Sequence, residues 1–283
     1  MIKPAVTMTV VLLMLSVLCP SSIPAAQPEE NWRDRISTEA GVVATSDIVE
    51  EIRFGRAVAA RIIGRYGLYE NTQIMIYINL VGQTIARGAN RPEIEFHFAV
   101  LNGDEIMAFG IPGGYIFITK GTLRAMRDEA ELAGVLAREV GHIAEKTAVR
   151  ELKIRGIEDA GITGLAQIIG GSTDPARAAF RKAVDKAMDM LFRKGYKREE
   201  DEKADEDAVI LCAMAGYDPS GLVRYMDRTH GVAGNQTGAI DGAQTSVEVR
   251  INRLKAYILQ EGADAGDFKT YEKRFIKYMS AVR

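Results

Sequence analysis

Apolar residues recur every three to four positions through most of the chain, which is the period of a helix with one buried face. The pattern predicts helices at 46–67, 71–88, 128–154, 175–192, 199–214, 219–229, 247–259 and 268–283. Ser46 and Asn71 are residue types that cap helix N-termini, and Gly67 suits a helix C-terminus. We therefore expect a mainly helical protein.

The period changes to two between residues 94 and 100, where apolar and polar or small residues alternate as in a half-buried strand. Two more short strands are predicted at 106–109 and 115–119. The residues between them, Pro112, Gly113 and Gly114, favour a hairpin turn over a phosphate-binding loop, because no helix follows to supply amide donors. The expected fold class is α+β and mainly helical, with a small antiparallel sheet.

The first residues have the pattern of a secretory signal peptide. Lys3 precedes an apolar run at 10–18, and small residues lie near Ala26. We expect a signal peptide at 1–26, a flexible leader at 27–45 and one domain at 46–283, exported to the periplasm or cell envelope. No lipid anchor is expected at Cys19, because Leu18 stands where a lipoprotein signal has a small residue. Without the signal peptide Cys212 is the single cysteine, which excludes an intramolecular disulfide.

The composition of the chain argues against nucleic acid as a partner. The chain has 283 residues, a formal net charge of -2 and 47% hydrophobic residues, so it has no basic excess to attract nucleic acid. The apolar stretch 160–171 is too short to span a membrane, although a peripheral membrane contact stays open.

One helix carries a motif close to that of zinc peptidases. In H-E-x-x-H, two histidines one turn apart bind zinc and the glutamate activates a water. Residues 138–142 read Arg-Glu-Val-Gly-His. An arginine has no acceptor lone pair and cannot bind zinc, so Arg138 breaks the motif.

Segments around this helix carry a wider resemblance. Residues 107–117 (MAFGIPGGYIF), 129–137 (EAELAGVLA), 198–205 (REEDEKAD) and 215–219 (AGYDP) resemble the motifs of metallopeptidase family 48. The resemblance covers about 46–254. It implies a zincin-like (gluzincin) domain with an active-site helix, and a zinc peptidase of envelope quality control in which Glu139 is the general base and His142 a metal ligand.

The chain departs from the family pattern mainly at the positions that bind the metal. Arg138 stands at the first histidine ligand, and Asp201 stands where the family has its glutamate ligand. Other departures are Thr147 at a frequent histidine position, Met107 before the Ala-Phe pair, and Gln244 at a His-Pro pair. The resemblance also implies that Asp205 turns inward with Asp201, beside the site.

Simpler interpretations of these residues stay open. His142 could be retained by packing, and Glu139 could be paired with Arg138, Lys146 or Arg150. The charged run 193–207 is expected to be a solvated helix face, apart from Asp201 and Asp205.

Two functions from different classes follow, and a third, purely structural role as an envelope assembly partner that never used the cleft stays open. The first is an inactive pseudopeptidase that binds peptides or an envelope protein partner and holds no metal. In it, Arg138 replaces the zinc as the positive charge beside Asp201. The alternative is an active zinc metalloendopeptidase that degrades misfolded envelope proteins. The strand at Tyr115, Ile116, Phe117 and Ile118 is expected to be an edge that binds extended polypeptide by strand addition.

Overall fold

The computed structural model describes residues 40–152, 174–229, 246–280 and 282. The chain divides into two compact units, Met1–Gly41 and Val42–Arg283, and the description concerns the second. The predicted signal peptide, most of the predicted leader, the apolar stretch 160–171 and Gln244 lie outside the described residues. No helix of the described part is long and apolar enough to cross a membrane.

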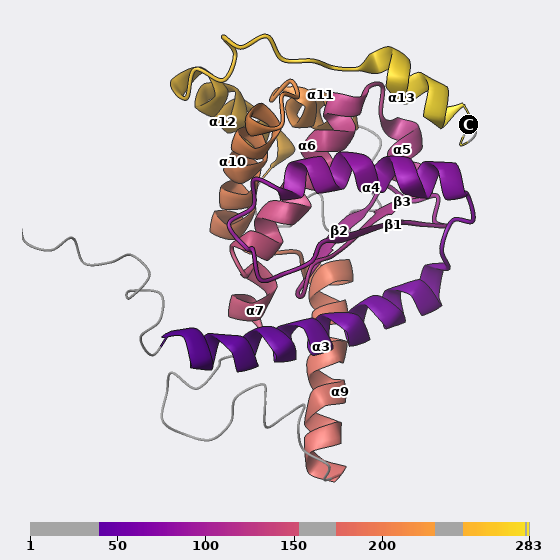
Figure 1. Cartoon of the computed structure of the whole chain (residues 1–283), viewed down its shortest axis with the longest axis vertical. Helices are drawn as coiled ribbons and strands as arrows, with labels where there is room; N and C mark the ends of the chain where they lie inside the picture. The colour runs from indigo at the N-terminus through magenta and orange to yellow at the C-terminus, as the bar shows by residue number, and fades with distance from the viewer. Residues whose placement is uncertain (1–39, 153–173, 230–245, 281, 283) are drawn as a thin grey trace, which may run out of the picture. The chain divides into compact units, whose positions relative to one another are not determined.

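Helices make up most of the described chain, as predicted (Figure 1). They are α3 (Ala40–Tyr66), α4 (Thr72–Ala86), α5 (Lys120–Ala125), α6 (Glu129–Ala144), α7 (Thr147–Glu151), α9 (Asp174–Asp189), α10 (Arg198–Met214), α11 (Gly221–Thr229), α12 (Val247–Gln260) and α13 (Glu272–Met279), with a π-helical turn η1 (Met190–Lys194). Asn71 caps α4 as expected, because its side chain accepts a hydrogen bond from the Ile74 amide.

Two predicted helix boundaries are wrong. α3 begins at Ala40, so Ser46 lies inside it and part of the predicted leader is helical; no proline interrupts the sequence there. The predicted helix at 128–154 is two helices, α6 and α7, separated by Lys146 with a left-handed φ of 53°. Arg91 stabilises this break, since its Nη1 donates to the Ile143 carbonyl at the end of α6 over 2.8 Å.

The sheet has three strands, β1 (His97–Leu101), β2 (Ala108–Ile111) and β3 (Tyr115–Thr119), in the order β1-β3-β2. β2 and β3 form the predicted antiparallel hairpin, whereas β1 runs parallel to β3. The sheet is therefore mixed, and the predicted wholly antiparallel sheet is wrong. β3 is also not an edge: both its sides are paired, so it cannot accept a further strand.

The outer edge of β1 is covered by side chains of α4. Asn79 donates to the Phe98 carbonyl over 2.7 Å and accepts from the Phe98 amide, and Gln83 donates to the Phe96 carbonyl. The burial alternation predicted for 94–100 is present, although strand pairing begins only at His97. These amides satisfy backbone groups that an edge strand otherwise offers to another chain.

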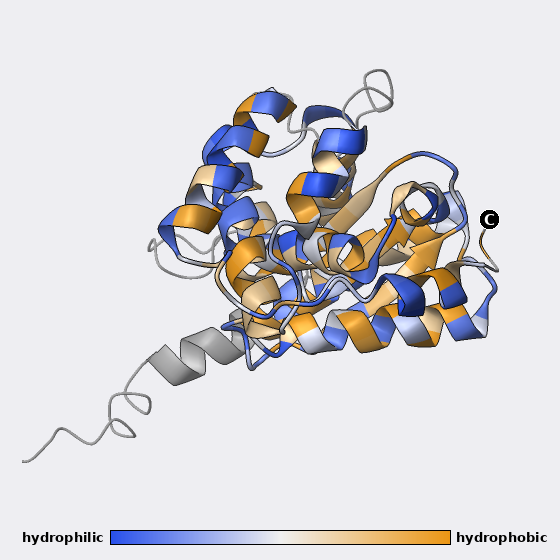
Figure 2. Ribbon diagram, turned by 90° about the horizontal axis from the view of Figure 1, so that it is seen from above, coloured by the Kyte–Doolittle hydropathy of each residue, from blue (hydrophilic) through white to orange (hydrophobic). Residues whose placement is uncertain are grey.

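Helix α6 is the buried centre of the fold. α4, α10, α11 and α13 all pack against it, and residues 129–143 of α6 are buried. In Figure 2 the strands are coloured as hydrophobic, whereas the helices around them alternate between hydrophobic and hydrophilic positions. The hydrophobic sheet and the buried helix together form the core that holds the candidate site.

The start of α6 is fixed by hydrogen bonds. The buried Glu129 carboxylate accepts from the hydroxyls of Tyr77 and Tyr217, each over 2.8 Å, and from Arg274 of α13. Asp128 caps the helix by accepting from the Glu131 amide. Residues from distant parts of the sequence thus hold the helix that carries Arg138.

Helix α3 approaches the turn between β2 and β3 closely at Gly55, and this contact can be tested by substitution. A Cβ at Gly55 would lie 1.7 Å from the Pro112 carbonyl oxygen, whereas a Cβ at Gly64 would meet nothing within 4 Å. We expect Gly55→Ala to lower the free energy of unfolding by about 3 kcal/mol. Gly64→Ala, the matched control, should raise it by about 0.5 to 1 kcal/mol. Urea unfolding of both variants measures the difference, and equal midpoints would contradict the packing of α3 on the turn.

Candidate functional site

Helices α6 and α10 bring the predicted site residues together. Arg138, Glu139 and His142 of α6 face Asp201 and Asp205 of α10, and each is at most 2% exposed. The other predicted residues, on β3, lie in the middle of the sheet. The site is therefore a buried cluster of charges.

The Arg138 guanidinium contacts three carboxylates. Nη2 donates to Asp201 Oδ1 over 2.6 Å, Nη1 to Glu139 Oε1 over 2.9 Å and Nε to Asp205 Oδ1 over 3.1 Å. The predicted contact between Arg138 and Asp201 is present, and so is the pairing of Glu139 with Arg138. A planar guanidinium suits this arrangement, because its donors point to several acceptors at once.

A second arginine, to which the sequence analysis gave no role, completes the cluster. Arg250 of α12 donates to Asp205 from Nε over 2.9 Å and from Nη2 over 2.8 Å, and it is 1% exposed. Asp205 thus bridges the two guanidinium groups. None of the motifs named in the sequence analysis includes Arg250; it lies only within the stretch 46–254 over which the chain resembles the family.

His142 lies beside the cluster with few polar contacts. Its Nε2 is 3.4 Å from Asp201 Oδ1, and its Nδ1 is 3.4 Å from the hydroxyl of Thr147. Nε2 has no hydrogen-bond partner among the described residues. The ring of Tyr196 packs against the imidazole, with 4.4 Å between the ring centroids.

Side chains of the site occupy both polar backbone groups of Gly110 in β2. Glu139 Oε2 accepts from the Gly110 amide over 2.6 Å, and the Tyr196 hydroxyl donates to the Gly110 carbonyl over 3.4 Å. Phe192 of η1 packs on Phe109, with 4.7 Å between ring centroids. This part of β2 is thus covered by the chain's own side chains.

The charges in the cluster stabilise one another. Burial by itself would raise the pKa of Asp201, but Arg138 and His142 outweigh it and hold that pKa below its ordinary value. Burial opposes the charged form of Arg138, yet Asp201, Glu139 and Asp205 raise its pKa, so the guanidinium stays protonated. Each charge is costly to bury alone and is kept by its partners.

These residues do not fit a catalytic zinc site, which needs three protein ligands. The imidazole Nε2 of His142 is a suitable ligand atom. However, the Arg138 guanidinium is bonded to Asp201, the carboxylate that would be the next ligand, and an arginine cannot ligate a metal. Within the described residues, no three His, Cys, Asp or Glu side chains form a group that could hold a metal ion.

The charged run on α10 divides between two faces, as predicted, except that Glu202 is buried as well as Asp201 and Asp205. Glu202 pairs with the exposed Arg198 over 2.7 Å, and Lys203 pairs with Asp207 over 2.8 Å. These pairs are partly solvated on the side of the cation and contribute little to stability.

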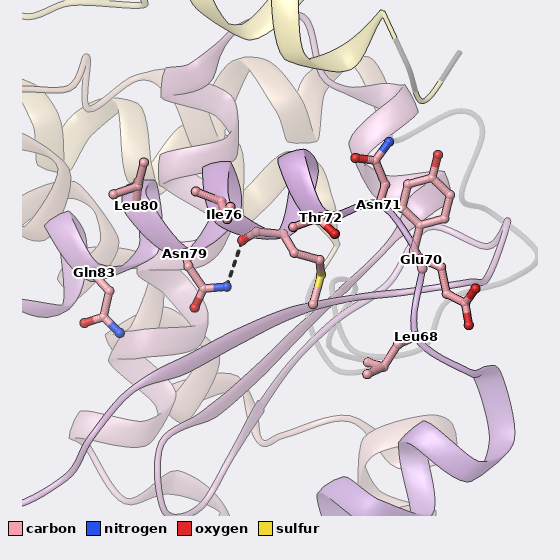
Figure 3. A pocket seen from close by; sticks show the side chains of 10 residues that line it. Leu68, Glu70, Asn71, Thr72, Ile76, Asn79, Leu80 and Gln83 are labelled. Atoms are coloured by element: carbon pink, nitrogen blue, oxygen red, sulfur yellow. Dashed lines mark hydrogen bonds between the residues drawn. The ribbon is translucent and has the colours of Figure 1, made fainter.

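A surface pocket of about 640 Å³ lies elsewhere, beside α4 and the loop before it (Figure 3). Leu68, Ile76 and Leu80 provide exposed apolar surface, and the Asn79 and Gln83 amides are bonded to the carbonyls of Phe98 and Phe96. No residue of the charged cluster lines this pocket. No histidine, cysteine or lysine is among its lining residues.

The family assignment rests on most of the domain and not on a single motif. The model of Peptidase family M48 matches residues 76–262, which is more than half of the chain and includes α6 and α10. The chain belongs to Peptidase family M48.

Curated relatives of this M48 chain include proteases with longer sequences. It is 23% identical to the beta-barrel assembly-enhancing protease of Yersinia pestis, over 71% of this chain and 41% of that protein. For the Escherichia coli protein of that name the values are 22%, 72% and 42%. It is 26% identical to the mitochondrial metalloendopeptidase OMA1 of Arabidopsis thaliana, over 59% of this chain and 33% of the relative. The chain thus spans less than half the length of these relatives.

The charge cluster predicts a pH-dependent loss of stability in Arg138→Ala. At pH 7 the substitution leaves Asp201, Asp205 and Glu139 without the cation between them, so we expect a loss of about 3 to 5 kcal/mol. Without Arg138 the pKa of Asp201, which Arg138 lowers in the wild type, should rise. Below its ordinary pKa near 4 this carboxyl group is protonated in both the folded and the unfolded variant, so its share of the penalty should shrink as the pH falls.

Urea unfolding of the wild type and the variant at pH 7 and pH 4.5 measures this difference. In the wild type the lowered pKa of Asp201 means that its contribution persists above the ordinary pKa and is lost only as the pH falls through the lowered value. Arg198→Ala is the control: it removes an exposed arginine whose partner Glu202 still pairs with Arg253, and it should cost less than about 1 kcal/mol at both pH values. An equal loss for Arg138→Ala at the two pH values would contradict the electrostatic explanation.

Proposed function

We propose that this M48 chain is a pseudopeptidase of the cell envelope that keeps a zincin-like fold, has replaced the metal by an arginine, and binds polypeptide without cleaving it. The observation that carries the proposal is the buried Arg138 guanidinium bonded to Asp201, Glu139 and Asp205. The envelope setting is suggested by the sequence pattern at 1–26 and by the names of the beta-barrel assembly-enhancing relatives.

Restricted access to Glu139 also supports the inactive assignment. A general base must approach the group from which it takes a proton. Glu139 is 1% exposed, and its two oxygens are engaged by Arg138 and by the Gly110 amide. A glutamate held in this way serves as an acceptor that ties α6 to β2.

The alternative, an active zinc metalloendopeptidase, requires a different arrangement at these residues. Asp201 would have to exchange Arg138 for a metal, and a third ligand would have to come from elsewhere. The binding role avoids this rearrangement. It also no longer depends on β3 as a peptide-binding edge, because β3 is the central strand.

Metal analysis tests the inactive assignment. The wild-type protein, purified without added zinc and then incubated with zinc and dialysed, should hold far less than one equivalent, because Arg138 occupies a ligand position. Arg138→His with Asp201→Glu should gain affinity for zinc, since the introduced imidazole, the introduced longer carboxylate and His142 would together supply three ligands. Arg138→His alone is the matched intermediate. One tightly bound zinc ion per wild-type chain would contradict the proposal.

Binding without cleavage is the second expected property. Fluorescence anisotropy with labelled, permanently unfolded casein should report binding by the full chain that a chelator leaves unchanged. Gel analysis after prolonged incubation should detect no new fragments. Glu139→Gln should release fragments no more and no less than the wild type does. Chelator-sensitive fragments would favour the active alternative, and lack of binding would remove the proposed role.

A further inference from the structure

Helices α3 and α9 form a basic surface in a protein whose net charge is negative. Between Arg53 and Tyr66, α3 has four arginines and no acidic residue. α9 and η1 together carry six basic and three acidic residues, whereas the whole chain has a net charge of -2. We call the exposed side of 53–65 and 177–194 the cationic ledge.

The two helices of the ledge adjoin at the molecular surface. Arg61 Nη1 lies 2.6 Å from Asp185 Oδ1, and these side chains are 53% and 58% exposed. Beneath this pair the rings of Phe54 and Phe180 pack edge to face, with 6.2 Å between centroids. The exposed sides of α3 and α9 therefore continue into each other, and Figure 1 shows the two helices crossing.

Most cations of the ledge lack a compensating carboxylate. Within the described part of the chain, no carboxylate lies within ion-pairing distance of Arg53, Arg65, Arg177, Arg181, Lys182 or Lys186. Elsewhere arginines pair regularly with acidic neighbours, as Arg228 does with Glu131 and Arg253 with Glu206. Uncompensated cations repel one another, so the ledge is not explained by the stability of the fold.

The position of Arg177 supports the same conclusion. It lies in the first turn of α9, the end where the helix dipole disfavours a positive charge. An exposed arginine there does not stabilise its own helix. Its charge is available to an anion outside the described chain.

The shape of the ledge suits a broad partner rather than a small ligand. Its cations are spread over two helices and a π-helical turn. Between its arginines the outer face of α3 carries small exposed residues, Ala60 and Gly64. No large side chain at these two positions would keep a flat partner away from the guanidinium groups. A plane with many negative charges is the surface of an anionic lipid bilayer.

We propose that the cationic ledge docks this protein on an anionic phospholipid surface, as a peripheral contact that is independent of the charge cluster around Arg138. The attraction is electrostatic, and each cation near such a surface contributes roughly a fivefold gain in binding. It should weaken with salt, because charges farther apart than about 10 Å are screened at 0.1 M ionic strength.

Co-flotation of the full chain with lipid vesicles tests the proposal. Vesicles of phosphatidylcholine with one-third phosphatidylglycerol should carry the protein at 20 mM salt and release much of it at 500 mM. Vesicles of phosphatidylcholine alone should not carry it. Equal flotation with both kinds of vesicle, or none with the anionic kind, would overturn the proposal.

Substitutions on α9 assign the contact to the ledge. Arg177→Gln, Arg181→Gln and Lys182→Gln together should weaken flotation by roughly a hundredfold, and the corresponding Glu variant should abolish it. The matched control places Glu at Lys255, Lys273 and Lys277, exposed residues of α12 and α13, and should bind as the wild type does.

All these variants have the same N-terminal residues, so a difference in vesicle binding between them is due to the substituted cations of the ledge. Circular dichroism melting must first show that each variant is folded. If the Glu variant unfolds, the Gln variant is used for the flotation assay, because it removes positive charge without adding negative charge. Equal losses in the α9 and control variants would refute the proposal. Salt-sensitive binding to polyglutamate without binding to anionic vesicles would also refute it, in favour of an acidic protein partner.

Discussion

The need to compensate charge in a dry interior determines the arrangement around α6. Arg138 is 1% exposed and shares its donors among Asp201, Glu139 and Asp205, while Arg250 provides a second cation for Asp205. Removing Arg138 would take the shared cation from three buried carboxylates, which costs far more than an exposed ion pair is worth. The cluster therefore joins α6, α10 and α12 into a unit whose geometry is set by hydrogen-bond directions.

The same helix is held at both ends by buried polar contacts. At its start, Glu129 accepts from two tyrosines and from Arg274 near the end of the chain. At its end, Arg91 donates to the Ile143 carbonyl and pairs with Glu51 of α3. Hydrogen bonds depend on direction, whereas hydrophobic contacts do not. These polar contacts therefore fix the position of α6 in the core, and with it the position of the Arg138 cluster.

Membership of Peptidase family M48 is a property of the fold, whereas the chemistry depends on a few side chains. In this chain α6 and α10 face each other, and the group between their carboxylates is a guanidinium. The sequence resemblance predicts that Arg138 and Asp201 stand at ligand positions of the family, and the structure brings these two side chains into contact. We propose that they are a compensating pair, in which a shorter carboxylate leaves room for a longer cation.

The sequence by itself determined the local structure: the helical periods, the Asn71 cap, the hairpin at Pro112–Gly114 and the conflict between Arg138 and a zinc motif. These depend on residues close together in the chain. Only the tertiary structure decided that β3 is central, that Lys146 divides the predicted helix, that Arg250 joins the cluster and that Tyr196 contacts Gly110. Such contacts join residues far apart in sequence, and they form only when burial forces each polar group to find a partner, which no local pattern specifies.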